Sequence, residues 1–438
     1  MMFGISKQSC FMLIFTWIST VCVLGITPLT VFAQESLESE PFAFHAEPSP
    51  DLSSALADPF TYQGEPIVFN GFRLWPNLTL EQRYTDNLLA TENNTQSDFI
   101  TVLKPELEIW KSLGRHDFSL LMNSEILQHW DRSQDNVENY NVAFNADLEA
   151  RQGLNIPIKL LYRDGHLRRA YQRRSNADQI VKTPLNVKRW RAESGFIYKP
   201  NRLMLSLLGD YSQVRLGNEE LINGGFLIRD NRDVNITQAT GKVSYDLKTG
   251  LSPFVQTSYT KENYINETPG AVSRNNDSLR ILAGADFNFK GLIAGFIGAG
   301  IDRRSYDDAT VGNTGDVLLD AEIYWDPIPK TRLRFDARRE TTEDNLLIQQ
   351  LTETAFGLGI DHELRQNLFA RLAAHYGYDE FMDTNRQDKT LDSHFELLKI
   401  IGPHLQLGAG YQYLTKDSSV PGLDMDQSVV FLRIKTAL

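Results

Sequence analysis

The sequence has little cysteine, little basic charge and few long apolar runs. Its only two cysteines, Cys10 and Cys22, lie in an N-terminal apolar segment, so the rest of the chain has neither a disulfide nor a cysteine-ligated metal. Lysine and arginine number 44 against 56 aspartates and glutamates, a net charge of −12. That acidity argues against general nucleic-acid binding, which needs a basic face.

Catalytic signatures are also missing. The chain has no His-Glu-x-x-His, no Gly-x-Ser-x-Gly, no phosphate-binding loop and no EF-hand pattern. Gly295, Gly298 and Gly300 have the wrong spacing for a dinucleotide site and read better as small strand residues. We therefore predict that the protein is not an enzyme and uses no cofactor or metal. A membrane-embedded hydrolase, with a catalytic Ser and His on strands distant in the sequence, is a less favoured alternative.

The N-terminal segment has the form of an export signal. Lys7 precedes the apolar run "CFMLIFTWISTVCVLGI", and Val31-Phe32-Ala33 has the shape of a cleavage site. This run is short for a membrane anchor, so residues 1–33 are predicted to be a signal peptide that is cleaved. Residues 34–70 are rich in Pro, Ser and acidic residues, without a sustained period, and predict a flexible acidic periplasmic lead-in.

From Phe72 onward apolar and polar residues alternate in segment after segment. In "TRLRFDARRE", residues 331–340, Leu333, Phe335 and Ala337 take every second place, and mostly charged residues stand between them. Successive strand residues point to opposite faces of a sheet, so one face meets an apolar medium and the other meets water. Helical periodicity has little support here.

Short and long connections between these strands alternate along the chain. Eight short ones, such as "SLGR" at 112–115 and "GPH" at 402–404, alternate with long polar loops. This alternation predicts an all-β fold for residues 71–438: a transmembrane antiparallel β-barrel of about 18 strands with short periplasmic turns and long extracellular loops. No later segment reaches the roughly 18 consecutive apolar residues that a membrane-spanning helix needs. Strands are therefore the only candidates for crossing the membrane.

Charged residues on the polar parity are predicted to face the barrel lumen, because an Arg facing lipid costs about 2–4 kcal/mol at the bilayer midplane. Such charges tune the selectivity of pores. Ion pairing in a merely wet interior is the alternative explanation. The predicted pore-lining residues are Arg280, Asp286, Arg332, Arg334, Asp336, Arg338, Arg371 and Arg433.

One basic stretch stands out against the acidic chain. It is "GHLRRAYQRRSNADQIVKTPLNVKRWR", which surrounds one predicted extracellular loop. Guanidinium groups pair well with carboxylates and phosphates, so Arg168, Arg169, Arg173 and Arg174 are predicted to contact an anionic glycan or lipopolysaccharide. A solvated loop balanced by nearby acids is the alternative.

Residues 77–109, "NLTLEQRYTDNLLATENNTQSDFITVLKPELEI", resemble the opening of a family of bacterial outer-membrane β-barrel porins, beta-barrel porin 2. The matching features are Arg83-Tyr84-Thr85-Asp86-Asn87 at a strand end, Ser97-Asp98-Phe99-Ile100 and Pro105-Glu106-Leu107. Thr85 departs from the Asp that is frequent in the family, and the terminal Leu438 from the Phe that ends many barrels.

The resemblance implies a location and a role. Members often accompany exopolysaccharide-synthesis gene clusters, so it implies a porin-like channel in the outer membrane of a Gram-negative bacterium, for export or passage of an exopolysaccharide or other saccharide. Expected partners are outer-membrane lipid and lipopolysaccharide, the polysaccharide and the barrel-assembly machinery. Nucleic acid is not an expected partner, and the sequence does not predict the oligomeric state. A closed structural or adhesive barrel whose loops bind surface glycans is the alternative.

Overall fold

The computed structural model describes residues 64–169, 181–221, 224–247, 250–266, 270, 272–344, 349–382 and 384–437. The predicted signal peptide and nearly all of the lead-in lie outside them. Nearly all of the described chain is β-strand, with two single 3-10 turns, η3 (Ser133–Asp135) and η4 (Asp230–Arg232). Within these ranges, helix of the length and apolarity that a membrane crossing requires does not occur.

The strands follow one another along the chain with little intervening structure. They are β1 (Ile67–Phe69), β2 (Phe72–Thr85), β3 (Asp98–Leu113), β4 (His116–His129), β5 (Val137–Arg151), β6 (Leu154–His166), β7 (Asn186–Tyr198), β8 (Leu203–Leu216), β9 (Glu219–Glu220), β10 (Phe226–Leu227), β11 (Val234–Tyr245), β12 (Leu251–Tyr264), β13 (Asn276–Phe289), β14 (Ile293–Tyr306), β15 (Thr314–Ile328), β16 (Thr331–Asp344), β17 (Gln349–Arg365), β18 (Leu368–Phe381), β19 (Gln387–Ile400), β20 (Leu405–Ser418) and β21 (Met425–Ala437).

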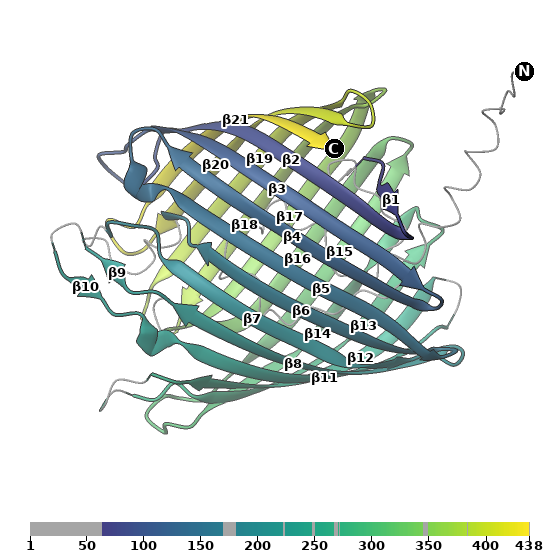
Figure 1. Ribbon diagram of the computed structural model, residues 1–438. Helices are drawn as coiled ribbons and strands as arrows, with labels where there is room; N and C mark the ends of the chain where they lie inside the picture. Colours follow the sequence, from purple (N-terminus) through teal and green to yellow (C-terminus); the bar gives the residue numbers. More distant parts are fainter. Residues whose placement is uncertain are drawn as a thin grey trace, which may run out of the picture.

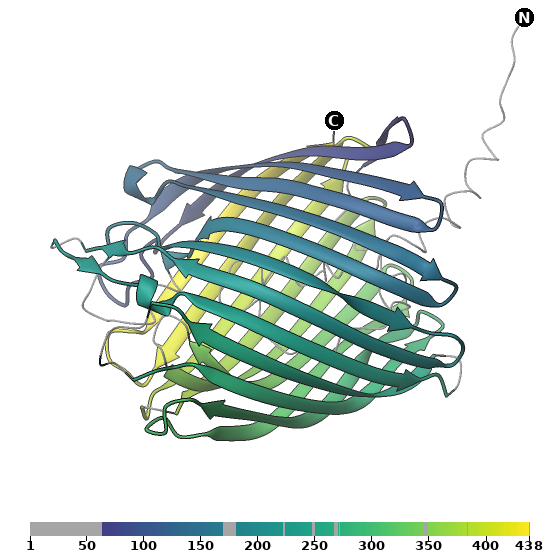
Figure 2. The same cartoon turned by 60° about the horizontal axis from the view of Figure 1, so that its bottom comes forward.

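Eighteen of these described strands close into one barrel (Figures 1 and 2). Each of β2 to β8 and β11 to β21 pairs antiparallel with its sequence neighbours, and β21 pairs with β2 from Asn77↔Ala437 to Thr85↔Val429. Closure removes the free edges that an open sheet would expose. The prediction of an antiparallel barrel of about 18 strands is confirmed.

The two ends of the barrel differ as the sequence indicates. At one end tight turns join the strands; Gly114, with φ +67°, turns the chain between β3 and β4. At the other end the connections are longer, and one of them contains the β9–β10 hairpin (Figure 1). The short connections therefore share one rim, here called the turn side, and the long ones share the loop side.

The outer face of the wall is apolar. Leu432 on β21, Ile297 on β14 and Leu358 on β17 have 63%, 55% and 54% of their surface exposed. Their sequence neighbours at the next position point inward, as strand geometry requires. Exposed aromatic residues such as Trp325 and Tyr84 lie near the strand ends, where an amphipathic ring suits a membrane interface. This surface is built to face lipid.

β1 lies within residues 34–70, the range that the sequence assigns to an irregular lead-in. It pairs with the turn-side end of β2, from Ile67↔Leu74 to Phe69↔Phe72. Since β21 pairs with β2 only from Asn77 onward, β1 continues the ladder on β2 past the end of β21. Strand pairing with the barrel wall thus begins before residue 71.

Candidate functional site

The inner face of the barrel is the candidate site, because the predicted pore-lining residues lie on it. Arg334 on β16 stands opposite Tyr324 of β15 and Gly359 of β17, on the parity that alternates with the exposed Phe335. Strand register and the exposure of alternating residues place all eight predicted pore-lining residues at inward positions. They are Arg280, Asp286, Arg332, Arg334, Asp336, Arg338, Arg371 and Arg433.

Carboxylates accompany the inward arginines. Arg371 donates to both oxygens of Asp361 at 2.7 and 2.9 Å, and Arg332 donates to both oxygens of Asp326 at 2.9 Å. Such bidentate pairs fix the orientation of the guanidinium plane. Asp286 pairs with Lys242 at 3.2 Å. The inner face is thus lined by paired charges of both signs.

A second group of inward charges joins the first and last barrel strands. Arg433 on β21 contacts Glu81 on β2 at 3.9 Å and also Glu396 on β19. Arg83 pairs with Glu81 and, at 3.6 Å, with Glu125 on β4. Lys104 reaches the same Glu125 at 2.7 Å. These contacts carry an ionic network across β19, β21, β2, β3 and β4.

Glycines on the inner face make room for these long side chains. Gly359 stands opposite Arg334 and Gly357 opposite Asp336 in the β16–β17 ladder. A Cβ added to Gly357 would collide with the carboxylate of Asp336, whereas one added to Gly359 would touch the Arg334 side chain at 3.6 Å. The charged side chains therefore lie along the wall over these glycines.

The loop-side end of β16 separates from β15 while it stays paired with β17 as far as Asp344↔Gln349. β15 and β16 pair from Ile328↔Thr331 to Leu319↔Arg339, and no register pair follows in the described residues. Inward side chains of distant strands hold the departing end: Arg280 of β13 donates to Glu340 and to the carbonyl of Thr341, both at 3.0 Å. Residues 340–343 of β16 thus cross the inner face of β13 and β14.

The same inward segment is held at its tip. The hydroxyl of Tyr306 on β14 donates to Glu343 at 2.9 Å, and Arg304 lies 3.1 Å from Glu262 and 4.0 Å from Glu343. Glu340 and Thr341 are both buried although they point to opposite sides of β16. A strand that forms part of a two-faced wall exposes one parity, so burial of both fits a segment enclosed within the barrel.

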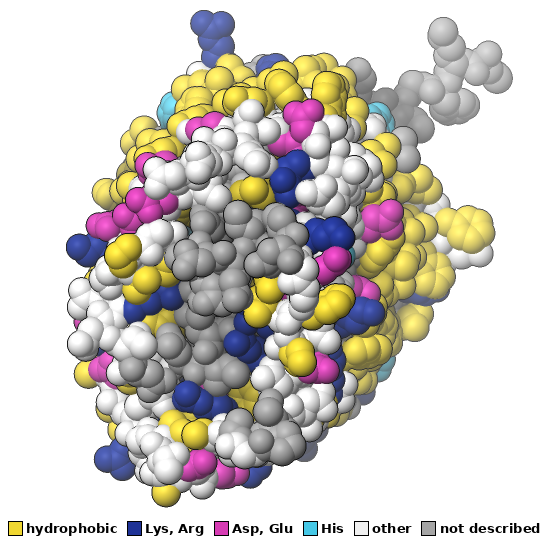
Figure 3. Space-filling view, turned by 90° about the vertical axis from the view of Figure 1, so that its left-hand side faces the viewer, with side chains coloured by type: hydrophobic (Ala, Val, Ile, Leu, Met, Phe, Trp, Pro, Cys, Tyr) yellow, Lys and Arg dark blue, Asp and Glu magenta, His cyan; other side chains and the backbone are white. Residues whose placement is uncertain are grey.

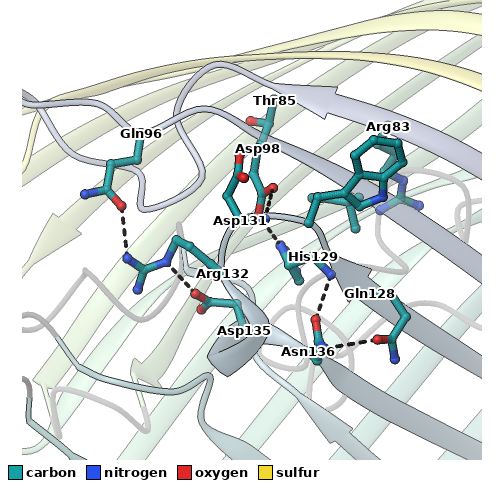
Figure 4. A network of polar contacts seen from close by, with 12 residues as sticks. Arg83, Thr85, Gln96, Asp98, Gln128, His129, Asp131, Arg132, Asp135 and Asn136 are labelled. Atoms are coloured by element: carbon teal, nitrogen blue, oxygen red, sulfur yellow. Dashed lines mark hydrogen bonds and ion pairs between the residues drawn. The ribbon is translucent and has the colours of Figure 1, made fainter.

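The loop-side rim carries a polar network of its own (Figure 4). Asp98 at the start of β3 contacts His129 Nδ1 at 3.0 Å and accepts the backbone N–H of Asp131 at 3.1 Å. Arg132 donates to Gln96 at 2.9 Å and to Asp135 at 2.7 Å. The connection between β4 and β5 is therefore tied to the connection between β2 and β3.

The predicted basic loop lies at this rim. Arg169 is buried and donates to Asp135 at 2.7 Å, to the carbonyl of Val181 at 2.7 Å and to that of Lys182 at 2.8 Å. Burial lowers the pKa of this guanidinium, and the Asp135 carboxylate opposes that effect. These contacts give Arg169 a structural role. Arg168 is half-buried, and Arg173 and Arg174 lie outside the described residues.

The loop-side mouth combines an apolar cluster with charged side chains. Leu167 and Leu185 from the basic loop pack with Val214, Leu216 and Ile236 of β8 and β11 in an apolar cluster. In the space-filling view of this end, Lys and Arg side chains stand around the mouth, and the outer wall beside it is hydrophobic (Figure 3).

Sequence reasoning located the inward arginines but missed most of their partners. The partners include Lys242, Glu81, Glu340 and Asp361, which all lie on the polar face of strands with alternating sequence. Their inward orientation could therefore have been predicted from the sequence. Which carboxylate meets which arginine depends on register and curvature. In the described residues no group of three or more His, Cys, Asp or Glu could hold a metal ion.

A family profile described as "putative beta-barrel porin 2" matches residues 58–438. No curated protein matches. Among solved structures, the outer membrane protein OpdK of Pseudomonas aeruginosa is 10% identical, with a TM-score of 0.43 over 83% of this chain and 99% of OpdK. The FrpB iron transporter of Neisseria meningitidis is 8% identical, with a TM-score of 0.48 over 81% of this chain and 64% of FrpB.

The ferric citrate transporter FecA is 11% identical, with a TM-score of 0.44. The alignment covers 79% of this chain, and the chain spans 60% of the length of FecA. Proteins this different in sequence can share a strand arrangement without sharing a cargo.

Proposed function

The chain belongs to the "putative beta-barrel porin 2" family, and from this premise we propose that it is a passive channel of the outer membrane through which a saccharide passes, with an exopolysaccharide as the expected cargo. The observation that carries this proposal is the contrast between the two faces of the wall. The outer face is apolar, while the inner face carries paired charges on strand after strand.

The pairing of those charges supports a polar, hydroxyl-rich cargo. A saccharide that enters the barrel exchanges hydrogen bonds with water for bonds with guanidinium and carboxylate groups. Conduction needs binding that is favourable enough for entry and weak enough for release. Arg332, whose Nε and one Nη atom bond Asp326 and whose side chain is 20% exposed, offers a passing hydroxyl a weaker site than an unpaired arginine would. Transport would need no covalent chemistry.

The test is single-channel conductance of the refolded full-length chain in a planar bilayer. The expected result is a steady conductance that falls when an exopolysaccharide fragment is added on the loop side. A matched amount of a neutral polymer too large to enter serves as the control. A barrel that runs as a folded, heat-modifiable band and yet conducts nothing would refute the channel.

A specific observation favours a second candidate, a closed structural or adhesive barrel. The loop-side mouth contains the apolar cluster of Leu167, Leu185 and Ile236, and residues 340–343 of β16 cross the interior. In this case the loops would bind surface glycans while the lumen stays shut. Retention of the folded protein on immobilised glycan, together with absent conductance, would support this alternative over the channel.

A further inference from the structure

A cleft of about 500 Å³ opens on the outer face of the barrel at the loop side, away from the lumen. It is lined by residues of β4 to β7 and of the β4–β5 connection: Gln128, Asn136, Val137, Glu138, Tyr140, Asp164, His166, Asn186 and Lys188. Tyr140, Asp164 and Lys188 lie side by side at one level of the ladder. Lys188 and Trp190 are exposed, whereas Val187 and Arg189, which alternate with them, are buried, so this parity faces outward.

The walls of the cleft are held in place by hydrogen bonds. Asn186 donates to Asp164 at 2.8 Å and to the carbonyl of Gly165 at 3.2 Å. Asn136 donates to Gln128 at 3.0 Å and accepts the backbone N–H of His129 at 2.7 Å (Figure 4). Pre-oriented polar groups lose little conformational entropy when a ligand binds.

The chemistry of the lining favours sugar hydroxyls over phosphate. Three amide side chains, those of Gln128, Asn136 and Asn186, offer donors and acceptors together, as a hydroxyl also does. Two carboxylates, of Glu138 and Asp164, face a single ammonium, that of Lys188, so the formal charge of the lining is negative. A phosphate would meet repulsion here, whereas vicinal hydroxyls can bridge neighbouring amide and carboxylate oxygens.

An aromatic platform lies directly below the cleft on the same outer face. The rings of Tyr162 and Trp190 are 5.4 Å apart between centroids, and Trp190 is 53% exposed. They stand two residues along β6 and β7 from Asp164 and Lys188, about 7 Å toward the apolar wall at the usual rise per residue. Rings at this level mark the membrane interface.

We infer that this cleft binds the saccharide headgroup of a glycolipid in the surrounding outer leaflet. A polar cleft above exposed rings and an apolar wall fits an amphiphile whose sugars enter the cleft and whose acyl chains lie along the barrel. The inference goes beyond the proposed channel and does not depend on it, because the charged lining residues Glu138, Asp164 and Lys188 lie on the parity that faces away from the lumen. It also differs from the predicted role of Arg168 and Arg169, since it invokes no arginine.

The experiment measures binding of rough-type lipopolysaccharide to the full-length chain in nanodiscs. The cleft variant is Asp164→Ala with Lys188→Ala, a pair 3.5 Å apart. The chain offers a matched control in Asp277→Ala with Lys261→Ala, an outward cross-strand pair 3.7 Å apart on β12 and β13. Gln128→Ala, at an exposed position of β4, is a milder cleft variant that removes one amide and no charge.

We expect the double cleft variant to weaken binding roughly tenfold, which corresponds to about 1.4 kcal/mol, and the control to stay within about twofold. Removal of the phosphates from the glycolipid should leave the affinity of the parent protein nearly unchanged. Cleft variants that fold and bind like the parent would overturn the site. A loss on dephosphorylation would overturn sugar recognition, and equal binding of the delipidated oligosaccharide would overturn a glycolipid as the source. Bilayer conductance of the same variants should not change, so this test and that of the channel fail separately.

Discussion

The carboxylate of Asp135 on η3 accepts a hydrogen bond from Nε of Arg169 at 2.7 Å, although the two residues belong to different loop-side connections. The side chains of both are almost fully buried, at 1% and 6% exposure. Arg132 donates to the same carboxylate at 2.7 Å. One buried acid therefore joins the β4–β5 connection to the β6–β7 connection.

Asp135→Asn should loosen the β6–β7 connection. The change leaves a buried guanidinium without its counter-charge, at a cost of about 1–3 kcal/mol. The measurement is hydrogen exchange at the amide of Lys182, which bonds the carbonyl of Glu220 at 2.6 Å. Glu220→Gln removes an exposed ion pair with Lys182 and should shift the same opening free energy by less than about 0.5 kcal/mol. Equal exchange rates in both variants would contradict the structural role of Asp135.

Glu340→Gln should free the inward end of β16. The substitution removes the charge that pairs with Arg280 at 3.0 Å and with Arg338 at 3.2 Å, and both arginines stay inside the barrel. If the barrel conducts, we expect a larger and noisier single-channel conductance. Asp326→Asn, which breaks the Arg332 pair near the turn side, is the control and should leave the noise at the parent level.

Gly357→Ala should displace Asp336. The added Cβ collides with that carboxylate, which must rotate off the wall and away from His375, now 3.7 Å distant. We expect a reduced conductance and a lower temperature for the shift in electrophoretic mobility. Gly377→Ala is matched to it, because its Cβ would meet only Cβ of Thr390 at 3.9 Å. Similar losses in both would show that any inward methyl group is harmful.

Arg371→Gln should move the ion selectivity toward cations. It removes an inward positive charge and releases the Asp361 carboxylate from its bidentate pair, so the local potential becomes more negative. The measurement is the reversal potential in a KCl gradient. Lys389→Gln on β19, at an exposed position on the outer parity, removes the same charge from the other face. A shift of the same size there would assign the effect to net charge.

Strand alternation predicted the faces of the wall and not the contacts across them. Arg334 and Asp336 could be assigned to the inner face because the apolar Leu333 and Phe335 alternate with them. The pairing of Arg280 with Glu340, 60 positions later, depends on β16 leaving β15, for which the local sequence has no signal. Arg169 illustrates the opposite difficulty: a basic loop suggests solvent, but one buried acid in another loop changes its environment.

The outer cleft was not foreseen for a similar reason. Gln128, Asn136, Asp164 and Asn186 come from separate strand ends and connections, where polar residues are expected in any barrel. Only the register of four neighbouring strands gathers them above one pair of rings. A register is a property of the closed ladder, and alternation within single strands does not encode it.

The pairing of β2 with β21 sets an order in time. These strands are held together from Asn77↔Ala437 to Thr85↔Val429, between segments almost a full chain length apart. Every other junction in the wall joins neighbours in the sequence and can form soon after both partners exist. The cylinder therefore cannot close until β21 has been synthesised and exported, and until then both edge strands need shelter from premature partners.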